Sequence, residues 1–149
     1  MNTLIKSITL ALAISGLFSS ASVAQEEVLS PVPANEVVLA DLLYLKRVVV
    51  VFADSPNDPV FIRQLELLAV NSGDLLDRDV VLVSDTSPNP PSELRSELRP
   101  NGFSLVILDK DGRVVIRKPL PWDVREISRS IDKLPSRRDE VLDRNPAGR

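Results

Sequence analysis

The sequence predicts an α/β domain in which a parallel βαβ unit precedes an antiparallel ββα unit, so that four strands form one mixed sheet with helices on both faces. Three observations predict this class. Residues 48–53 are a run of apolar, mostly β-branched side chains, which is typical of a strand buried on both faces. A helical pattern and a second apolar run over 79–84 come next. Two further apolar runs then flank Asp111-Gly112, a strong signal for a hairpin.

The first 24 residues have the pattern of an export signal. Lys6 precedes an apolar core over residues 8–18, and Ser22-Val23-Ala24 form a small-residue cleavage site. A retained membrane anchor is the alternative interpretation, but an anchor needs about 20 apolar residues. We therefore expect a cleaved signal peptide over residues 1–24 and a chain that is exported to the periplasm or secreted.

The rest of the chain divides by composition into three parts. Residues 25–41 begin as a polar, proline-containing stretch, and we expect a linker and lead-in there, with a short helix where apolar residues recur at helical spacing over 37–45. The folded domain is expected over 42–135. Residues 136–149 are charged and are expected to form a tail with a frayed end.

The first strand is expected to lead directly into a helix. Asp58 is a predicted N-cap, because its carboxylate can accept hydrogen bonds from the free amides of the first turn. Pro59 at the next position gives up no hydrogen bond there. We expect Ser72-Gly73 to end this helix, and the strand at 79–84 to lie parallel to the first through a right-handed crossover.

The second half of the domain is predicted to hold a short helix, the hairpin and a last helix. Ser92 is the predicted cap of the short helix. The strands of the hairpin are expected over 103–108 and 114–117. Asp123 and Glu126 fit the capping-box spacing at the start of an amphipathic last helix.

This order of elements is the thioredoxin-like arrangement, and it locates a candidate site. In that fold the chemistry lies on the turn after the first core strand and on the loop before the hairpin. Here those places hold the candidate ligand-binding residues Asp54, Ser55, Asp58, Arg99 and Pro100. The chain contains no Cys, so disulfide exchange and peroxide reduction by a thiol are both excluded.

Composition narrows the possible chemistry further. The 149 residues include neither Cys nor His, which removes the thiol nucleophile, the commonest general base and the commonest transition-metal ligand. The net charge is −3 and only 4% of residues are aromatic, whereas nucleic-acid binding needs clustered positive charge and stacking side chains. We expect no metal, no cofactor, no nucleic-acid partner, and no membrane contact except through the signal peptide.

The polar residues of the first turn have a structural and a catalytic interpretation. Asp58 as a helix cap and Asp54 beside the helix dipole account for both carboxylates without catalysis. Ser55 as a nucleophile would need a base, and the chain offers no histidine for that role. We therefore assign no catalytic residue, and we keep a carboxylate- and arginine-dependent enzyme, such as a hydrolase using Asp54, Asp58 and Arg99, as an alternative.

Three other charged motifs also favour structural roles. Asp109-Lys110-Asp111-Gly112 resembles the start of a calcium loop, but the later acidic ligands are missing, so a hairpin turn is favoured. Asp77-Arg78-Asp79 is expected to make a local ion pair or cap a turn. Arg137-Arg138 is expected to lie in a solvated tail, with anion binding as the alternative.

Several of these segments together resemble a family of thioredoxin-like domains of unknown function, found in exported bacterial proteins and in vertebrate secreted matrix proteins of the equarin and sushi-repeat type. The matching segments are Arg47 to Ala53, Gln64, Asp77-Arg78-Asp79, Phe103 to Gly112, Ile131 to Pro135, Arg137-Arg138 and Glu140. The resemblance implies a thioredoxin-like fold. A likeness of the family to peroxiredoxins has been suggested, but the cysteine that such an activity requires is absent here, so no activity follows.

The leading hypothesis is therefore an exported, non-catalytic thioredoxin-like domain that binds a protein or a cell-envelope component. An extended peptide could bind at the sheet edge, in a groove between the first turn and the Pro100 loop. The enzyme described above is one alternative. A structural or adhesive protein that associates with itself is the other.

Overall fold

The computed structural model describes residues 29–145. The expected signal peptide over residues 1–24 and the last four residues of the expected tail lie outside the described residues. Within residues 29–145, no helix has both the length and the apolar character needed to cross a bilayer.

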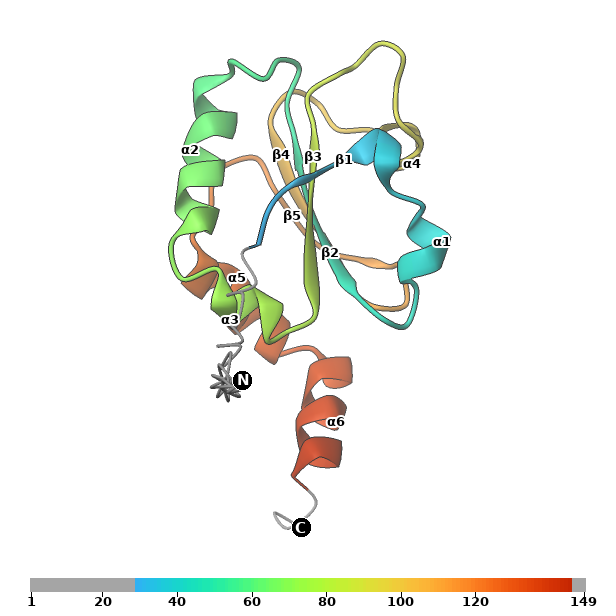
Figure 1. The fold of residues 1–149 in the computed structure, drawn as a ribbon, viewed down its shortest axis with the longest axis vertical. Coiled ribbons are helices and arrows are strands. Elements are labelled where there is room, and N and C mark those ends of the chain that lie inside the picture. The colour runs from blue at the N-terminus through green and yellow to red at the C-terminus, as the bar shows by residue number, and fades with distance from the viewer. Residues whose placement is uncertain (1–28, 146–149) are drawn as a thin grey trace, which may run out of the picture.

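One mixed sheet forms the centre of the domain, with its five strands in the order β1-β3-β2-β4-β5 (Figure 1). The strands are β1 (Val32–Pro33), β2 (Arg47–Phe52), β3 (Val80–Asp85), β4 (Ser104–Leu108) and β5 (Val114–Lys118). β3 lies parallel to both β1 and β2, whereas β4 is antiparallel to β2 and to β5. The predicted succession of a parallel βαβ unit and an antiparallel hairpin unit is confirmed.

The predicted central strand is also confirmed. Every residue of β2 is buried, because β3 pairs with one of its edges and β4 with the other. Val50 stands in register with Val83 of β3 and with Val106 of β4. A run of β-branched residues without alternation fits this position, since both faces of the strand are covered.

The sheet has five strands rather than the four that were predicted. The additional strand, β1, lies in the stretch expected to be a polar linker, and it pairs Val32 with Val83 and Pro33 with Ser84 of β3. Proline is tolerated because β1 is an edge strand and needs no second hydrogen-bonded neighbour. A strand of two residues is too short for any hydrophobic period to reveal it.

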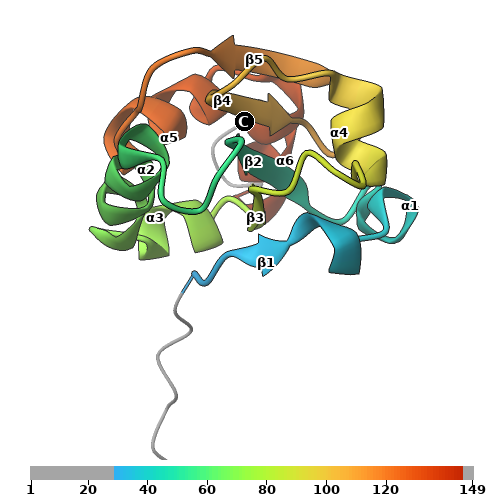
Figure 2. The same ribbon diagram turned by 90° about the horizontal axis from the view of Figure 1, so that it is seen from above.

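Helices cover both faces of the sheet, as predicted. They are η1 (Ala34–Glu36), α1 (Leu39–Leu42), α2 (Pro59–Ala69), α3 (Gly73–Leu76), α4 (Glu93–Leu98), α5 (Val124–Asp132) and α6 (Pro135–Arg144). Figure 2 shows α2, α3 and α5 on one face and α1 and α4 on the other. Alternate residues of β2 supply the two cores: Val49 and Val51 pack on the first face, and Val48 and Val50 on the second.

The three predicted helix caps are present. Asp58 accepts from backbone amides at the start of α2, and Ser92 does the same for α4. Asp123 and Glu126 form a complete capping box at the start of α5. These local signals hold because a cap involves only residues within one turn of each other.

Two predictions were wrong, one about the end of the first helix and one about the C-terminal segment. Gly73 begins α3 instead of ending the preceding helix, and the left-handed residue after α2 is Asn71, with φ 58°. The charged tail that was expected to be solvated forms α6 as far as Arg144, and Arg137 within it is buried. The expected frayed end falls mainly on residues 146–149, outside the described residues. Arg47 and Lys110, which pair with Glu140 in this segment, lie far away in the sequence. The sequence of the segment alone therefore shows only a run of charged residues, which is typical of a solvated tail.

Candidate functional site

The predicted site lies where β2 ends and the chain turns into α2. Asp58 uses its Oδ1 to accept from the amides of Val60 at 2.8 Å and Phe61 at 3.4 Å. Ser55 Oγ accepts from the amide of Asn57 at 3.2 Å. Both side chains therefore serve the backbone of the turn and the first turn of the helix, which is the structural role that their types suggested.

Asp54, the first residue of this turn, faces a buried arginine that the sequence analysis did not single out. Arg95 of α4 places Nη1 3.3 Å from Asp54 Oδ1. Its Nη2 donates to the backbone carbonyls of Ala53 at 2.6 Å and Asp85 at 3.0 Å. The guanidinium carbon also lies 5.4 Å from the centre of the Phe52 ring. Arg95 thus joins the ends of β2 and β3 to α4.

Asp85 is the buried counter-ion of this arginine. Its Oδ1 accepts from Arg95 Nε at 3.0 Å, and its Oδ2 accepts from Ser92 Oγ at 2.5 Å. Ser92 Oγ in turn accepts from the amide of Arg95 at 3.0 Å. A serine beside a carboxylate resembles part of a nucleophilic site, but both oxygens of this carboxylate are already engaged, one by the Arg95 guanidinium and the other by Ser92. The cluster Asp85–Ser92–Arg95 is therefore a structural tie.

A signal for Asp85 does exist in the sequence. It directly follows the second apolar run, and the carboxyl ends of parallel neighbouring strands meet at one edge of a sheet. In the structure Asp85 stands in register with Phe52, the last residue of β2. Arg95 gives no such signal, because nothing local indicates that α4 turns this side chain inward.

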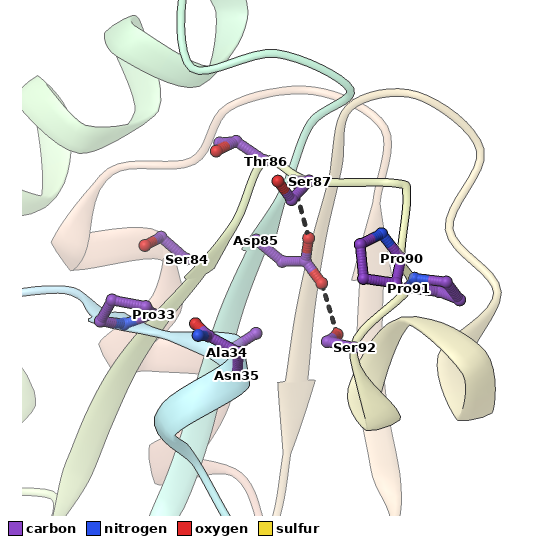
Figure 3. Close-up of a pocket in the computed structure, with 10 residues that line it drawn as sticks. All are labelled: Pro33, Ala34, Asn35, Ser84, Asp85, Thr86, Ser87, Pro90, Pro91 and Ser92. Carbon is purple, nitrogen blue, oxygen red and sulfur yellow. Dashed lines mark hydrogen bonds between the residues drawn. The ribbon is translucent and has the colours of Figure 1, made fainter.

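A pocket of about 460 Å³ opens beside the cluster, on the side of β1 (Figure 3). It is lined by Pro33, Ala34, Asn35, Ser84, Asp85, Thr86, Ser87, Pro90, Pro91 and Ser92. Proline rings and small hydroxyl or amide groups make up its walls, and its one ionisable lining residue is Asp85, which Arg95 neutralises. Such a lining favours a neutral, partly apolar ligand held by a few hydrogen bonds.

Arg99 and Pro100 lie apart from this pocket and are not in its lining. Arg99 ends α4 in the left-handed conformation, with φ 46°, and its side chain is exposed. Among the described residues, no hydrogen bond or ion pair joins Arg99 to Asp54 or Asp58. The structure therefore does not assemble the carboxylate and arginine set that the enzyme alternative required.

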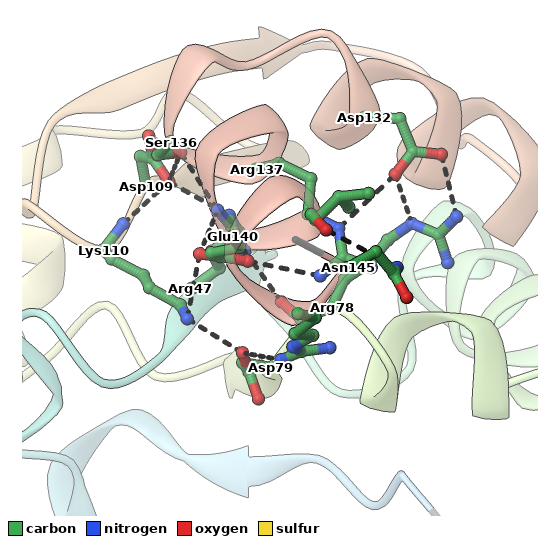
Figure 4. A network of polar contacts seen from close by, with 12 residues as sticks. Arg47, Arg78, Asp79, Asp109, Lys110, Asp132, Ser136, Arg137, Glu140 and Asn145 are labelled. Atoms are coloured by element: carbon green, nitrogen blue, oxygen red, sulfur yellow. Dashed lines mark hydrogen bonds and ion pairs between the residues drawn. The ribbon is translucent and has the colours of Figure 1, made fainter. Parts of the chain in front are cut away.

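A larger polar network lies at the opposite end of the sheet, where β2 begins (Figure 4). Its centre is Arg47, whose side chain is completely buried. Arg47 donates from Nε to Asp109 Oδ1 at 3.0 Å, from Nη1 to the Arg78 carbonyl at 3.1 Å, and from Nη2 to Ser136 Oγ at 3.0 Å. Asp109, which resembled the start of a calcium loop, is thus committed to the hairpin turn and to Arg47.

Glu140 of α6 completes the coordination of Arg47. It accepts from Arg47 Nη2 at 2.9 Å and Nη1 at 3.2 Å, and from Arg137 Nη1 at 3.2 Å. Lys110 Nζ lies 3.0 Å from the same carboxylate. Burial raises the pKa of Glu140, but the hydrogen bonds from Arg47, Lys110 and Arg137 outweigh burial and lower this pKa to about 2. The carboxylate is therefore charged at every physiological pH.

The motif Asp77-Arg78-Asp79 contributes two residues to the edge of this network. The expected local ion pair was wrong, but the alternative of a capped turn is present, because Arg78 Nη1 donates to the Asp74 carbonyl at 2.5 Å. Arg78 donates to both oxygens of Asp132 in α5, at 2.9 and 2.8 Å, and this hydrogen bonding lowers the pKa of Asp132. Asp79 accepts from Lys110 Nζ at 2.8 Å. Both partners lie more than 30 positions away, which no local pattern reveals.

Neither polar cluster has the composition of a metal site. Within residues 29–145, no group of three or more acidic side chains is placed to hold a metal ion. The carboxylates of both clusters instead face guanidinium or ammonium groups. Both clusters are thus built from ion pairs, and neither leaves a free base or nucleophile in its centre.

The family comparison gives one match. A model described as a domain of unknown function (DUF4174) matches residues 38–140. No curated protein matches the chain significantly.

Solved structures of thioredoxins and peroxiredoxins share the fold. The reduced 2-Cys peroxiredoxin of Plasmodium vivax superposes with a TM-score of 0.57 at 16% identity, covering 69% of this chain and 85% of its own. A yeast mitochondrial 1-Cys peroxiredoxin gives 0.51 at 14% identity, covering 72% and 100%. Chloroplastic thioredoxin z gives 0.50 at 17% identity, covering 64% and 81%. At such identities the likeness shows the thioredoxin-like fold alone.

Proposed function

The chain belongs to the DUF4174 family, and we propose that this member is an exported, non-catalytic module that binds an extended segment of a protein or cell-envelope component. Export is supported by the sequence pattern of residues 1–24. The binding role is supported by a thioredoxin-like fold in a chain without cysteine.

One observation carries the non-catalytic part of the proposal. The turn that follows β2 stands where thioredoxin-like enzymes keep their reactive residues, and three of its polar side chains are already engaged. Asp58 caps α2, Ser55 accepts from the turn backbone, and Asp54 pairs with Arg95. A nucleophile needs a free base within hydrogen-bond reach, and none stands beside Ser55 among the described residues.

The pocket beside the Asp85–Ser92–Arg95 cluster is the proposed binding site, in place of a groove near Pro100. Its walls include the edge strand β1, whose outer side has no partner strand among the described residues. An extended peptide added to such an edge gains backbone hydrogen bonds, while its side chains enter the neighbouring pocket. The proline rings and hydroxyl groups of the lining suit a peptide without charges at the buried positions.

Site-directed photocrosslinking tests this proposal. The chain has no Cys, so Ser87→Cys provides a single attachment point for a benzophenone label at the mouth of the pocket. Glu97→Cys, exposed on α4 and outside the pocket lining, is the matched control. We expect a crosslinked partner in envelope extract from position 87 that is absent from position 97 and disappears when Thr86→Trp fills the pocket.

Identical products from both positions, or none from position 87, would overturn the binding site. Export is tested separately by fractionating cells and sequencing the amino terminus of the recovered chain. A chain beginning at Gln25 in the periplasm or medium is the expected result. A cytoplasmic chain that retains residues 1–24 would contradict it.

A further inference from the structure

A second pocket, of about 600 Å³, lies where α6 meets the end of α5 and the turn before β3, at the opposite end of the sheet from the proposed peptide site. It is lined by Arg78, Asp132, Arg137, Arg138, Val141 and Leu142. These residues come from the turn before β3, the end of α5 and one face of α6. The pocket therefore combines guanidinium groups with aliphatic side chains, a composition unlike that of the first pocket.

Arg137 presents an incompletely used guanidinium to this pocket. The residue is only 9% exposed, and its Nη1 donates to Glu140, which lies on the side of the Arg47 network. Its Nε is buried and has no hydrogen-bond partner. Asp132 Oδ1 lies 3.8 Å from this nitrogen, within ion-pair distance but beyond hydrogen-bond distance, and both Asp132 oxygens accept from Arg78.

The orientation of this guanidinium suits a carboxylate ligand. The Nε and Nη2 groups of an arginine form a planar fork that matches the two oxygens of a carboxylate. The Nη1 side of Arg137 is held by Glu140, and the described residues place no acceptor within hydrogen-bond distance of Nε. Because this nitrogen is closed to solvent, a bound carboxylate completes its hydrogen bonding only when the Arg137 side chain shifts toward the pocket.

The charge of the lining also favours an anion. Three guanidinium groups, of Arg78, Arg137 and Arg138, face a single carboxylate, Asp132, which Arg78 neutralises through two hydrogen bonds. Arg138 is exposed and makes no ion pair or hydrogen bond through its side chain with the described residues. Its charge is available to a ligand at the pocket mouth.

The aliphatic part of the pocket stands next to these charges. Val141 and Leu142 are 43% and 42% exposed, which is high for large apolar side chains. They follow Arg138 by three and four positions, so the three residues share one face of α6, with neighbouring side chains about 5–6 Å apart. The ligand that fits carries its anionic group directly beside an alkyl chain.

We propose that this pocket binds an aliphatic carboxylate of the fatty-acid class. The carboxylate lies on the Arg137 and Arg138 guanidiniums, and the alkyl chain covers Val141 and Leu142. This site is independent of the peptide pocket at the other end of the sheet, so either proposal can fail without the other.

Titration of the isotope-labelled full chain with octanoate, followed by amide NMR signals, tests the site. We expect the signals of Arg137, Arg138, Val141 and Leu142 to move together. Acetate supplies the carboxylate without the chain, and octyl glucoside supplies the chain without the charge. Both controls are expected to bind at least about tenfold more weakly than octanoate, since each lacks one half of the recognised chemistry.

Substitutions then test the guanidinium groups and the aliphatic side chains of the pocket separately. Arg138→Gln is expected to weaken octanoate binding about tenfold, and Leu142→Ser several-fold, without loss of the folded spectrum because both side chains are at least partly exposed. Arg129→Gln, an exposed α5 arginine outside the pocket lining, is the matched control and is expected to leave the affinity unchanged. Equal weakening by the Arg138 and Arg129 variants, octanoate binding no tighter than acetate, or signal changes located elsewhere would overturn the proposal.

Discussion

Glu140→Gln tests whether charge, rather than packing, makes α6 part of the domain. The substitution preserves the shape of the side chain but removes the negative charge that faces Arg47, Lys110 and Arg137. The pKa of Glu140 is lowered from 4.5 to about 2 in the folded chain. Converted at about 1.4 kcal/mol per pKa unit, this difference corresponds to a stabilisation of about 3.5 kcal/mol by the ionised carboxylate at neutral pH, before any allowance for solvent screening. Because the Glu140 side chain is only 19% exposed, solvent screens its interactions only partly.

The pH dependence has a definite sign. A carboxylate with a lowered folded-state pKa stabilises the fold above its unfolded pKa, and this stabilisation disappears as the pH falls from about 4.5 towards 2. Urea unfolding of both proteins at pH 7 and pH 3 measures the effect. We expect the variant to be less stable by about 2–3 kcal/mol at pH 7 and by about half as much at pH 3.

Glu66→Gln is the matched control for this measurement. Glu66 pairs with Arg63 on the surface, with both side chains about 60% exposed, so its loss should cost less than about 1 kcal/mol. If Glu140→Gln lowers the free energy of unfolding equally little at pH 7, or by the same amount at pH 7 and pH 3, the charge of Glu140 does not hold α6 to the domain.

Two further substitutions separate structural from functional roles at the other end of the sheet. Arg95→Met should destabilise the fold by about 3–5 kcal/mol in urea unfolding, because it leaves the Asp85 carboxylate buried without its cation; a loss below about 1 kcal/mol would contradict this. Asp58→Ala should cost about 1 kcal/mol and Asp58→Ser much less, since serine retains the cap. Crosslinking from position 87 should be unchanged in both Asp58 variants, and its loss at unchanged stability would instead make Asp58 part of the binding site.

The features that were predicted from sequence are those fixed by neighbouring residues. The β-branched run at 48–53, the caps at Asp58, Ser92 and Asp123, and the hairpin around Gly112 each depend on contacts within a few positions. Gly112 adopts φ 81°, a conformation that glycine reaches without strain. Together these local signals were enough to order the elements and to identify the fold.

The features that were missed depend on distant partners. A solvated Arg137 was predicted, although Arg137 pairs with Glu140 on the same helix. That local pair does not reveal that α6 packs against the sheet, because Arg47, the partner of Glu140 in β2, lies 93 positions earlier in the chain. The candidate site was located by fold analogy at the turn after β2, where Asp54 to Asp58 serve the backbone. Nothing in the amino-acid pattern indicated that a more extensive polar cluster would form at the opposite end of the same strand.

Five residues from the segments that carried the family resemblance meet at that opposite end. Arg47, Asp79, Lys110, Arg137 and Glu140 come from four separate segments and form one connected network of hydrogen bonds and ion pairs. This convergence gives the scattered matches a common physical basis.

Stability alone does not explain such a network. Removing the Arg47 side chain from water is costly, and well-packed apolar residues often stabilise a core as effectively as a buried ion pair. An ion-pair network differs from apolar packing in that its hydrogen bonds form in only one arrangement of the elements. Here that arrangement holds α6 against the start of β2 and fixes the Nη1 side of Arg137 on Glu140. The guanidinium is thereby oriented beside the pocket of Arg138 and Leu142, so the network that looks purely structural also positions the groups of the proposed carboxylate site.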